Sequence, residues 1–161
     1  MKYLIMCEGP NELEIIRMLL EHDKLIFTED DLLNLVPYHA RQIESNPTVK
    51  AALNLYPGEV QVLRIGDKLN DELKISKVYK KKITCVKKYC TKPELEMLLI
   101  ISEKLNSKFE KEKSKKSPKS FCKENVIYNK NRYNNSTTFF RDYYEDRMDL
   151  LEEGKNQAVL F

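Results

Sequence analysis

The chain has 161 residues, the length of a single folded domain, and 33% of them are charged, with a net charge of +3. The apolar run from Tyr3 to Cys7 is too short for a membrane helix and lacks the basic region of a signal peptide. The four cysteines include no Cys-x-x-Cys pair, so the spacing of a zinc site is absent. We therefore expect a soluble, cytoplasmic protein with reduced thiols and no membrane contact.

Charge is distributed unevenly along the chain. Residues 1–60 carry 5 Lys or Arg and 10 Asp or Glu, whereas residues 61–161 carry 23 and 15. A basic surface near an acidic cluster suits a polyanion held close to metal-binding carboxylates, although lysine-rich faces are more often simply solvated.

The first 60 residues predict a strand, a helix and a longer excursion. Residues 2–7 form a short apolar run of the kind found in buried parallel strands, and Gly9-Pro10 ends it. A helix is expected next, with Asn11 as its N-cap and Glu14 at the N3 position. Residues 24–58 predict a helical insert, with Thr28 and Asn46 as further helix starts.

Two more strands and two more helices are expected after the insert. Residues 60–65 predict a strand that ends at Gly66-Asp67, and residues 83–86 predict a third. A helix over residues 93–105 begins with a capping box formed by Thr91 and Glu94. The lysine-rich segment 106–125 is expected to be an exposed, partly mobile loop or frayed helix. The last helix covers about 137–153, with its aromatic residues in the core and Gly154 as its stop.

These elements predict one α/β domain over residues 1–161, with a mostly parallel sheet of about four strands flanked by helices and a core over about residues 1–105. In such sheets, ligands bind beyond the carboxyl ends of the strands. Glu8 and Glu12 follow the first strand, and Asp67 and Asp71 follow the second. Carboxylates from adjacent loops are suitable ligands for Mg²⁺, which takes one or two protein oxygens together with water and substrate phosphate.

Each of these acids also has a structural explanation. Glu12 lies in the first turn of a helix, where the macrodipole favours it, and Asp67 follows Gly66 as an ordinary turn residue. Glu96 is harder to explain structurally, because it lies in a helix that is apolar nearly all round.

The pattern strand-Glu8-Gly9-x-x-Glu12-helix, followed by a strand and Asp67, resembles the Toprim family of primases, topoisomerases, recombination proteins and overcoming-lysogenization-defect nucleases. That family has a glutamate after its first strand and an Asp-x-Asp after a later one, which together hold Mg²⁺. This sequence has Leu69 at the position of the second aspartate, and Asp71 follows two positions later. The resemblance covers about residues 1–105. Glu96, with Glu94 in reserve, is similar to a further acidic position of the nuclease branch.

The resemblance implies Mg²⁺- or Mn²⁺-dependent cleavage of phosphodiesters in DNA or RNA, with water as the nucleophile and with phage defence as one setting. It implies Glu8, Asp67 and Glu96 as catalytic residues and Glu8, Glu12, Asp67 and Asp71 as metal ligands. By region it implies four nucleic-acid-binding lysines, which are Lys113, Lys115, Lys116 and Lys119. A partner ATPase or another partner protein fits the small size of the chain.

Two alternatives stay open. The first is a catalytically inactive Toprim-like domain that binds nucleic acid or a partner protein through its basic second half, which the altered Asp-x-Asp favours. The second is a basic α/β binding module without a metal.

Overall fold

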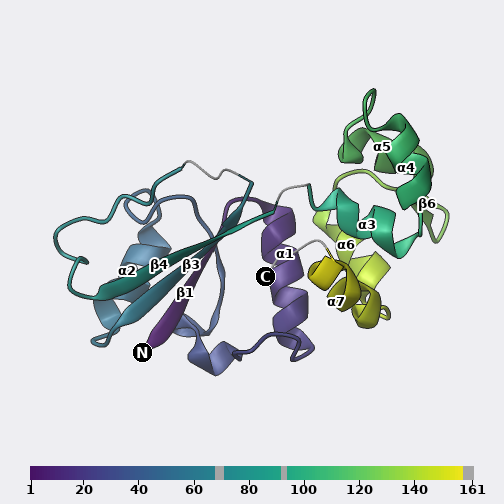
Figure 1. Cartoon of the computed structure of the whole chain (residues 1–161). Coiled ribbons are helices and arrows are strands. Elements are labelled where there is room, and N and C mark those ends of the chain that lie inside the picture. The colour runs from purple at the N-terminus through teal and green to yellow at the C-terminus, as the bar shows by residue number, and fades with distance from the viewer. Residues whose placement is uncertain (68–70, 92–93, 158–161) are drawn as a thin grey trace. The chain divides into compact units, whose positions relative to one another are not determined.

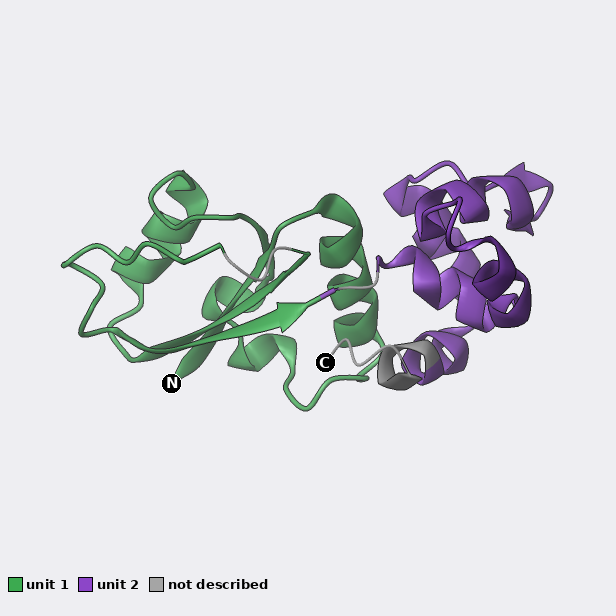
Figure 2. Cartoon of the chain, turned by 45° about the horizontal axis from the view of Figure 1, so that its top comes forward, with its two compact units in different colours: residues 1–90 green, residues 91–161 purple. Residues whose placement is uncertain are grey.

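The computed structural model describes residues 1–67, 71–91 and 94–157, with the backbone alone for residues 154–157. The chain forms two compact units, Met1–Cys90 (unit 1) and Thr91–Phe161 (unit 2), which are coloured separately in Figure 2. The sequence predicts one domain over residues 1–161, and the two compact units divide that range after Cys90. The two units are described separately below.

Unit 1 contains a parallel sheet of four strands in the order β2-β1-β3-β4 (Figure 1). The strands are β1 (Lys2–Cys7), β2 (Tyr38–His39), β3 (Val60–Gly66) and β4 (Ile83–Cys90). The predicted α/β class and mostly parallel sheet are therefore confirmed, and the arrangement is consistent with a Toprim-like fold. The central strands β1 and β3 are nearly continuous apolar runs, because both of their faces are covered.

One helix covers each face of this sheet. Alternate residues of a strand point to opposite faces, so Ile5 and Cys7 pack with α1 (Pro10–Glu21), whereas Leu4 and Met6 pack with α2 (Pro47–Leu55). The same alternation divides β3 between the two clusters. Glu8 follows Met6 at the next position of the α2 face, and Arg64 follows Val62 there. The strand pattern therefore carries both charged residues toward the same side of the sheet.

The predicted helical insert at residues 24–58 is only partly helical. It contains two 3-10 turns, η1 (Glu29–Asp31) and η2 (Leu33–Leu35), then β2 and finally α2. β2 pairs in parallel with the end of β1 and completes the expected number of about four strands, at a position where the sequence predicts a helical insert. Asn46 caps α2 as expected, because its side chain accepts a hydrogen bond from the Val49 amide at 3.0 Å.

The start of α1 differs from the prediction. Gly9 is the N-cap and Pro10 is the first helical residue, so Asn11 already lies inside the helix. Proline suits this first position, because its fixed φ is helical and the amide it lacks has no partner in the first turn. The helix consequently begins two residues after Glu8, with Gly9 between them as the N-cap.

Unit 2 consists of short helices and one hairpin. The elements in chain order are α3 (Glu96–Ser102), α4 (Asn106–Glu112), α5 (Pro118–Asn125), β5 (Ile127–Tyr128), β6 (Asn131–Arg132), α6 (Thr137–Tyr144) and α7 (Met148–Gln157). α3 packs against both α5 and α7. The aromatic residues expected in the core are buried, namely Phe140, Tyr143 and Tyr144.

Three predictions in unit 2 are wrong. For segment 106–125, expected to be a loop or a frayed helix, the loop is wrong, because the helices α4 and α5 bury Phe109 and Phe121 in ring contact at 5.2 Å. The predicted helix over 93–105 spans only Glu96–Ser102, and its N-cap is Leu95 without a side-chain cap, so the predicted capping box of Thr91 and Glu94 does not start it. The last helix is split into α6 and α7, and α7 continues through Gly154 rather than ending there. In α4 and α5, packing of the few apolar side chains outweighs the polar composition.

In the described ranges, no helix has the length and apolar character needed to cross a membrane.

Candidate functional site

The carboxyl ends of β1 and β3 place Glu8 beside Gly66. Cys7 pairs with Ile65 in the sheet, and the Glu8 amide donates to the Ile65 carbonyl at 2.9 Å. The Glu8 side chain crosses the next position of β3, where a β-carbon on Gly66 would lie only 2.2 Å from the Glu8 Cδ. A residue without a side chain at position 66 is therefore what allows the Glu8 carboxylate to lie over the sheet.

Arg64 supplies the positive charge next to this carboxylate. Its guanidinium donates to the Asp71 carboxylate at 2.8 Å, to the Asp71 carbonyl at 2.6 Å and to the Arg41 carbonyl at 3.2 Å. The distance from Arg64 Nη2 to Glu8 Oε1 is longer, at 3.7 Å. Arg64 is thus held in place by Asp71 and Arg41, and it attracts Glu8 without donating a hydrogen bond to it.

The carboxylate of Glu8 is buried, with 5% of the residue exposed, and neither of its oxygens accepts a hydrogen bond within the described part of the chain. Leaving a buried charged group without hydrogen bonds is costly, by about 1–3 kcal/mol or more. The nearby guanidinium offsets part of this cost. The lone pairs of the buried Glu8 carboxylate are therefore not used by any hydrogen-bond donor of the described residues.

Glu12 lies at the same junction between β1 and α1. Its carboxylate folds back over Gly9, where a β-carbon would meet Glu12 Oε2 at 2.2 Å. Burial raises the pKa of the Cys7 thiol well above its ordinary value, and the negative charge of Glu12 raises it further. Glu8 and Glu12 thus both add negative charge to the end of β1.

His39 supports the same end of the sheet from β2. Its Nε2 lies 3.2 Å from the Glu8 carbonyl oxygen, at hydrogen-bonding distance. In the sheet, His39 pairs with Cys7, the residue before Glu8. This contact constrains the backbone of Glu8, while the Glu8 side chain is directed toward Arg64.

Asp67 is exposed and follows Gly66 directly at the end of β3. Its carbonyl accepts a hydrogen bond from the thiol of Cys90 on β4, with an S···O distance of 3.8 Å. Its neighbours at 68–70, including Leu69 of the altered Asp-x-Asp, lie outside the described residues.

Mg²⁺ requires oxygen ligands, and the carboxylates near the ends of β1 and β3 meet this requirement unequally. Glu8 fits, because its oxygens are open, and Asp67 fits as an exposed carboxylate on the neighbouring strand. Asp71 does not fit, because its carboxylate is bound to Arg64. Over the described ranges, no three His, Cys, Asp or Glu side chains are close enough to share one metal ion. Two carboxylates are nevertheless enough for Mg²⁺ when water and phosphate complete its coordination.

The predicted catalytic residue Glu96 belongs to unit 2. It is buried, with 6% exposed, and its Oε1 accepts a hydrogen bond from the Tyr133 hydroxyl at 2.6 Å. Burial and this bond to Glu96 raise the pKa of Tyr133 far above its ordinary value. Glu94, the reserve position, accepts from the Lys119 amide at 3.2 Å, and the catalytic role of Glu96 stays a prediction.

The predicted nucleic-acid-binding lysines also lie in unit 2, around α4 and α5. Lys113 forms an ion pair with Glu110, and Lys116 forms ion pairs with Glu112 and Glu124. The charges of Lys113 and Lys116 are therefore partly neutralised by these glutamates. The role of Lys113, Lys115, Lys116 and Lys119 in binding stays a prediction.

Sequence reasoning missed Arg64 and His39. Arg64 had a detectable signal, because it is the one charged residue in the otherwise apolar and neutral strand VQVLRIG. A charge in a strand that is buried on both faces requires a partner, and acidic residues follow both central strands. His39 had no such signal, since β2 is only two residues long.

No protein-family model matches the chain, and neither a curated protein nor a solved structure does.

Proposed function

We propose that unit 1 cleaves phosphodiester bonds of nucleic acid in a reaction that depends on Mg²⁺ or Mn²⁺, in the manner of a Toprim-type nuclease. The observation that carries the proposal is the buried Glu8 carboxylate, whose two oxygens accept no hydrogen bond in the described residues. It lies beyond the carboxyl ends of parallel strands, which is where open α/β sheets bind their ligands.

Glu8 and Asp67 are the proposed metal-binding residues, and Glu12 adds negative charge beside them. Arg64 fixes Asp71 and draws the Glu8 carboxylate toward a single orientation. Gly66 leaves the space that this orientation needs. A bound divalent ion supplies Lewis-acid activation of the phosphodiester. Action in the cytoplasm, a role in phage defence and cooperation with an ATPase or another protein belong to this proposal as its biological setting.

The test combines metal binding with cleavage. We expect calorimetry to show Mg²⁺ or Mn²⁺ binding at millimolar affinity or tighter, and the full chain to cleave labelled DNA or RNA only with metal. Glu8→Gln should abolish both. Glu59→Gln is the matched control, because Glu59 is an exposed glutamate at the opposite, amino end of β3 and should leave both unchanged. Cleavage by Glu8→Gln at the normal rate would refute the assignment.

The alternative is a catalytically inactive Toprim-like domain that binds nucleic acid or a protein. It is favoured by the engagement of Asp71 with Arg64 and by Leu69 in the Asp-x-Asp position. It predicts nucleic-acid or protein binding that is insensitive to metal and to Glu8→Gln, with no cleavage of either DNA or RNA.

A further inference from the structure

A second lysine-rich segment lies in unit 1 and differs from segment 106–125 in its charge balance. Residues 74–90 contain seven lysines and no Asp or Glu, whereas residues 106–125 contain seven lysines and three glutamates. The seven are Lys74, Lys77, Lys80, Lys81, Lys82, Lys87 and Lys88. We call residues 74–90 the basic edge.

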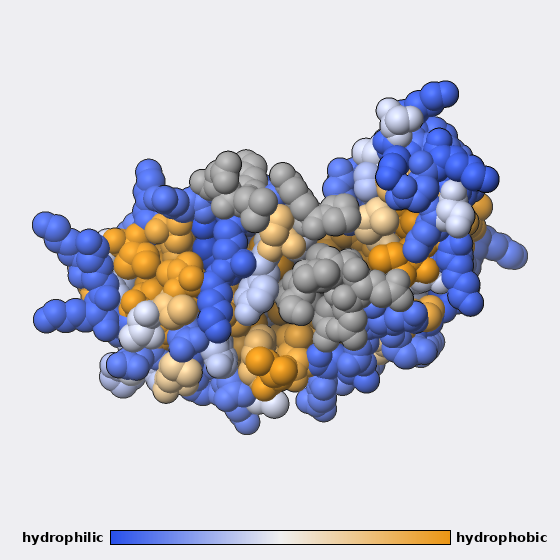
Figure 3. Space-filling model, in the orientation of Figure 1, coloured by the Kyte–Doolittle hydropathy of each residue, from blue (hydrophilic) through white to orange (hydrophobic). Residues whose placement is uncertain are grey.

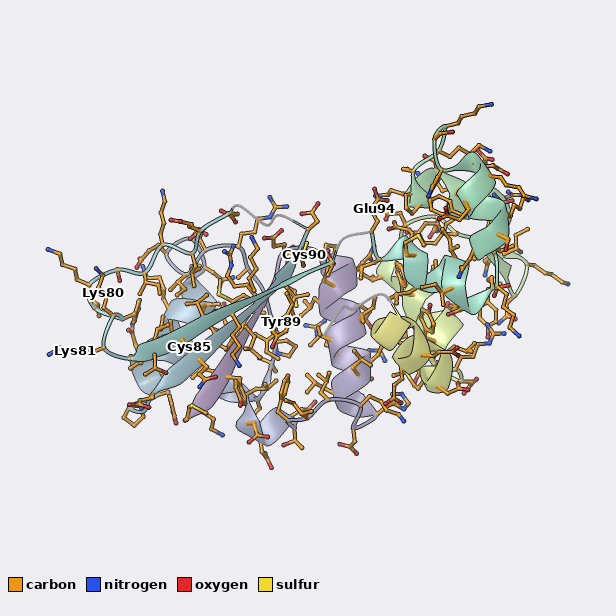
Figure 4. All side chains as sticks on the ribbon, viewed as in Figure 1. Lys80, Lys81, Cys85, Tyr89, Cys90 and Glu94 are labelled. Carbon is orange, nitrogen blue, oxygen red and sulfur yellow. The ribbon has the colours of Figure 1, made fainter. Side chains whose placement is uncertain are left out.

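The basic edge follows one border of the sheet. Among the described residues, β4 is the outermost strand on this side, because it pairs there with β3 alone. Figure 4 shows Lys80 and Lys81 extending outward from the turn before β4, with Tyr89 and Cys90 toward its other end. The space-filling view in Figure 3 shows hydrophilic side chains projecting at that far end of unit 1, next to apolar surface. The charges thus lie along an accessible border of the sheet rather than at one point.

Contacts divide the seven lysines into two groups. Lys82 and Lys88 donate to backbone carbonyls, those of Leu53, Tyr56 and Asp71, so they stabilise the fold. The other five are exposed. Within the described part of the chain, none of the seven forms an ion pair with a carboxylate, in contrast to Lys113 and Lys116 of unit 2. The positive charge of the basic edge is therefore not neutralised by neighbouring side chains.

Lysines on an edge strand also have a structural use, since they discourage pairing with another chain. That use applies to Lys87 and Lys88 on β4 itself, and it does not explain the lysines in the loop before β4. The edge also reaches the candidate site, because Lys88 Nζ lies 3.3 Å from the Asp71 carbonyl.

We propose that the basic edge binds the phosphate backbone of nucleic acid and directs it toward the carboxyl ends of β1 and β3. This inference rests on the proposed function and identifies the surface that holds its substrate. The eight residues of β4 span about 26 Å at about 3.3 Å each, comparable to seven or eight base pairs of a duplex. The contact is with phosphates, so it distinguishes neither base sequence nor sugar.

The experiment compares two matched sets of four lysines in the full chain. The edge variant carries Lys77→Gln, Lys80→Gln, Lys81→Gln and Lys87→Gln, which all replace exposed side chains and spare Lys82 and Lys88. The control variant carries Lys104→Gln, Lys111→Gln, Lys123→Gln and Lys130→Gln, which are exposed lysines of unit 2 outside the four predicted binding lysines. Binding to a fluorescently labelled 20-base-pair DNA duplex is measured by anisotropy over a range of salt concentrations in EDTA, so that metal and cleavage do not contribute.

We expect the edge variant to lose up to about 3.6 from the slope of log affinity against log salt, at about 0.9 for each lost phosphate contact. The control variant should lose less than about 1. An unchanged slope in the edge variant, or an equal loss in both variants, overturns the assignment to the basic edge. The binding assay contains no metal, so it does not depend on nuclease activity. If the edge variant loses binding but the original protein shows no cleavage in the separate Mg²⁺ assay, the nuclease proposal is refuted and the binding surface is retained.

Discussion

The guanidinium of Arg64 is shared between two carboxylates, that of Asp71 at 2.8 Å and that of Glu8 at 3.7 Å. Arg64 is 2% exposed, and its hydrogen bonds to Asp71 and Arg41 leave Glu8 as its electrostatic partner only. A fixed cation of the protein therefore lies beside the carboxylate that we assign to metal. This relationship leads to most of the following predictions.

Arg64→Met should lower the free energy of unfolding by roughly 3–5 kcal/mol, because it leaves the buried Glu8 carboxylate without its cation and Asp71 without its partner. Urea unfolding checks this value. Arg17→Met is the control, since Arg17 is half exposed and lies 3.9 Å from Glu14, and it should cost less than about 0.5 kcal/mol. Equal costs for the two variants would show that the Arg64 pair contributes little.

Asp71→Asn should leave Mg²⁺ affinity within about twofold of the original while lowering stability by about 1.5–3 kcal/mol, the range for a hydrogen bond to a charged group. The reason is that the Asp71 carboxylate is bound to Arg64. Calorimetry and urea unfolding of the same samples separate the two effects. A loss of Mg²⁺ binding as large as that in Glu8→Gln would instead make Asp71 a metal ligand.

Gly66→Ala should abolish Mg²⁺ binding, because the added methyl group would lie 2.2 Å from the Glu8 Cδ and would displace the whole carboxylate. The overpacking should also cost about 1–3 kcal/mol of stability. Gly9→Ala provides the comparison, since its methyl group meets the far end of the Glu12 side chain, which can rotate away. Retained Mg²⁺ binding in Gly66→Ala would contradict the proposed position of Glu8.

Tyr133→Phe should destabilise the protein by about 1–3 kcal/mol, because the Glu96 carboxylate loses the hydroxyl that donates to it at 2.6 Å. Unfolding in urea gives the value. The single variant Glu96→Gln, measured beside Tyr133→Phe, tests whether Glu96 has a structural or a catalytic role. If Glu96 has a structural role alone, Glu96→Gln retains metal-dependent cleavage, and if Glu96 is catalytic, cleavage is lost while the fold persists.

Cys122 should make stability depend on pH in alkaline solution. Burial, and then the charges of Glu96 and Glu94, raise the pKa of its thiol from 9.0 to about 12. The contribution of Cys122 to the free energy of unfolding is fully present below pH 9. It declines as the pH rises toward 12, because in that window the thiol ionises only in the unfolded chain. The decline is at most about 1.36 kcal/mol per pH unit for one proton.

Urea unfolding between pH 8 and 10.5 measures this slope. Cys122→Ala should have a shallower slope than the original protein. Identical slopes for the two proteins would show that Cys122 does not ionise differently in the folded and unfolded states.

The sequence by itself determined the three long strands, the helices that follow the first strand and precede the second, and the position of Glu8 at a strand end. Those features depend on local patterns, namely apolar runs that Gly and Pro interrupt and a side-chain cap at Asn46. Such patterns act over a few residues, so they can be read without knowledge of the rest of the chain.

Only the tertiary structure decided how the acidic residues are used. Asp71 and Glu8 are 63 positions apart in the sequence, yet both contact Arg64, because parallel pairing of β1 with β3 places their carboxyl ends together. Tertiary packing likewise explains why β2 pairs with the sheet and why the lysine-rich segment 106–125 forms the helices α4 and α5. In these cases burial of a few apolar side chains and the pairing of buried charges outweighed the local composition.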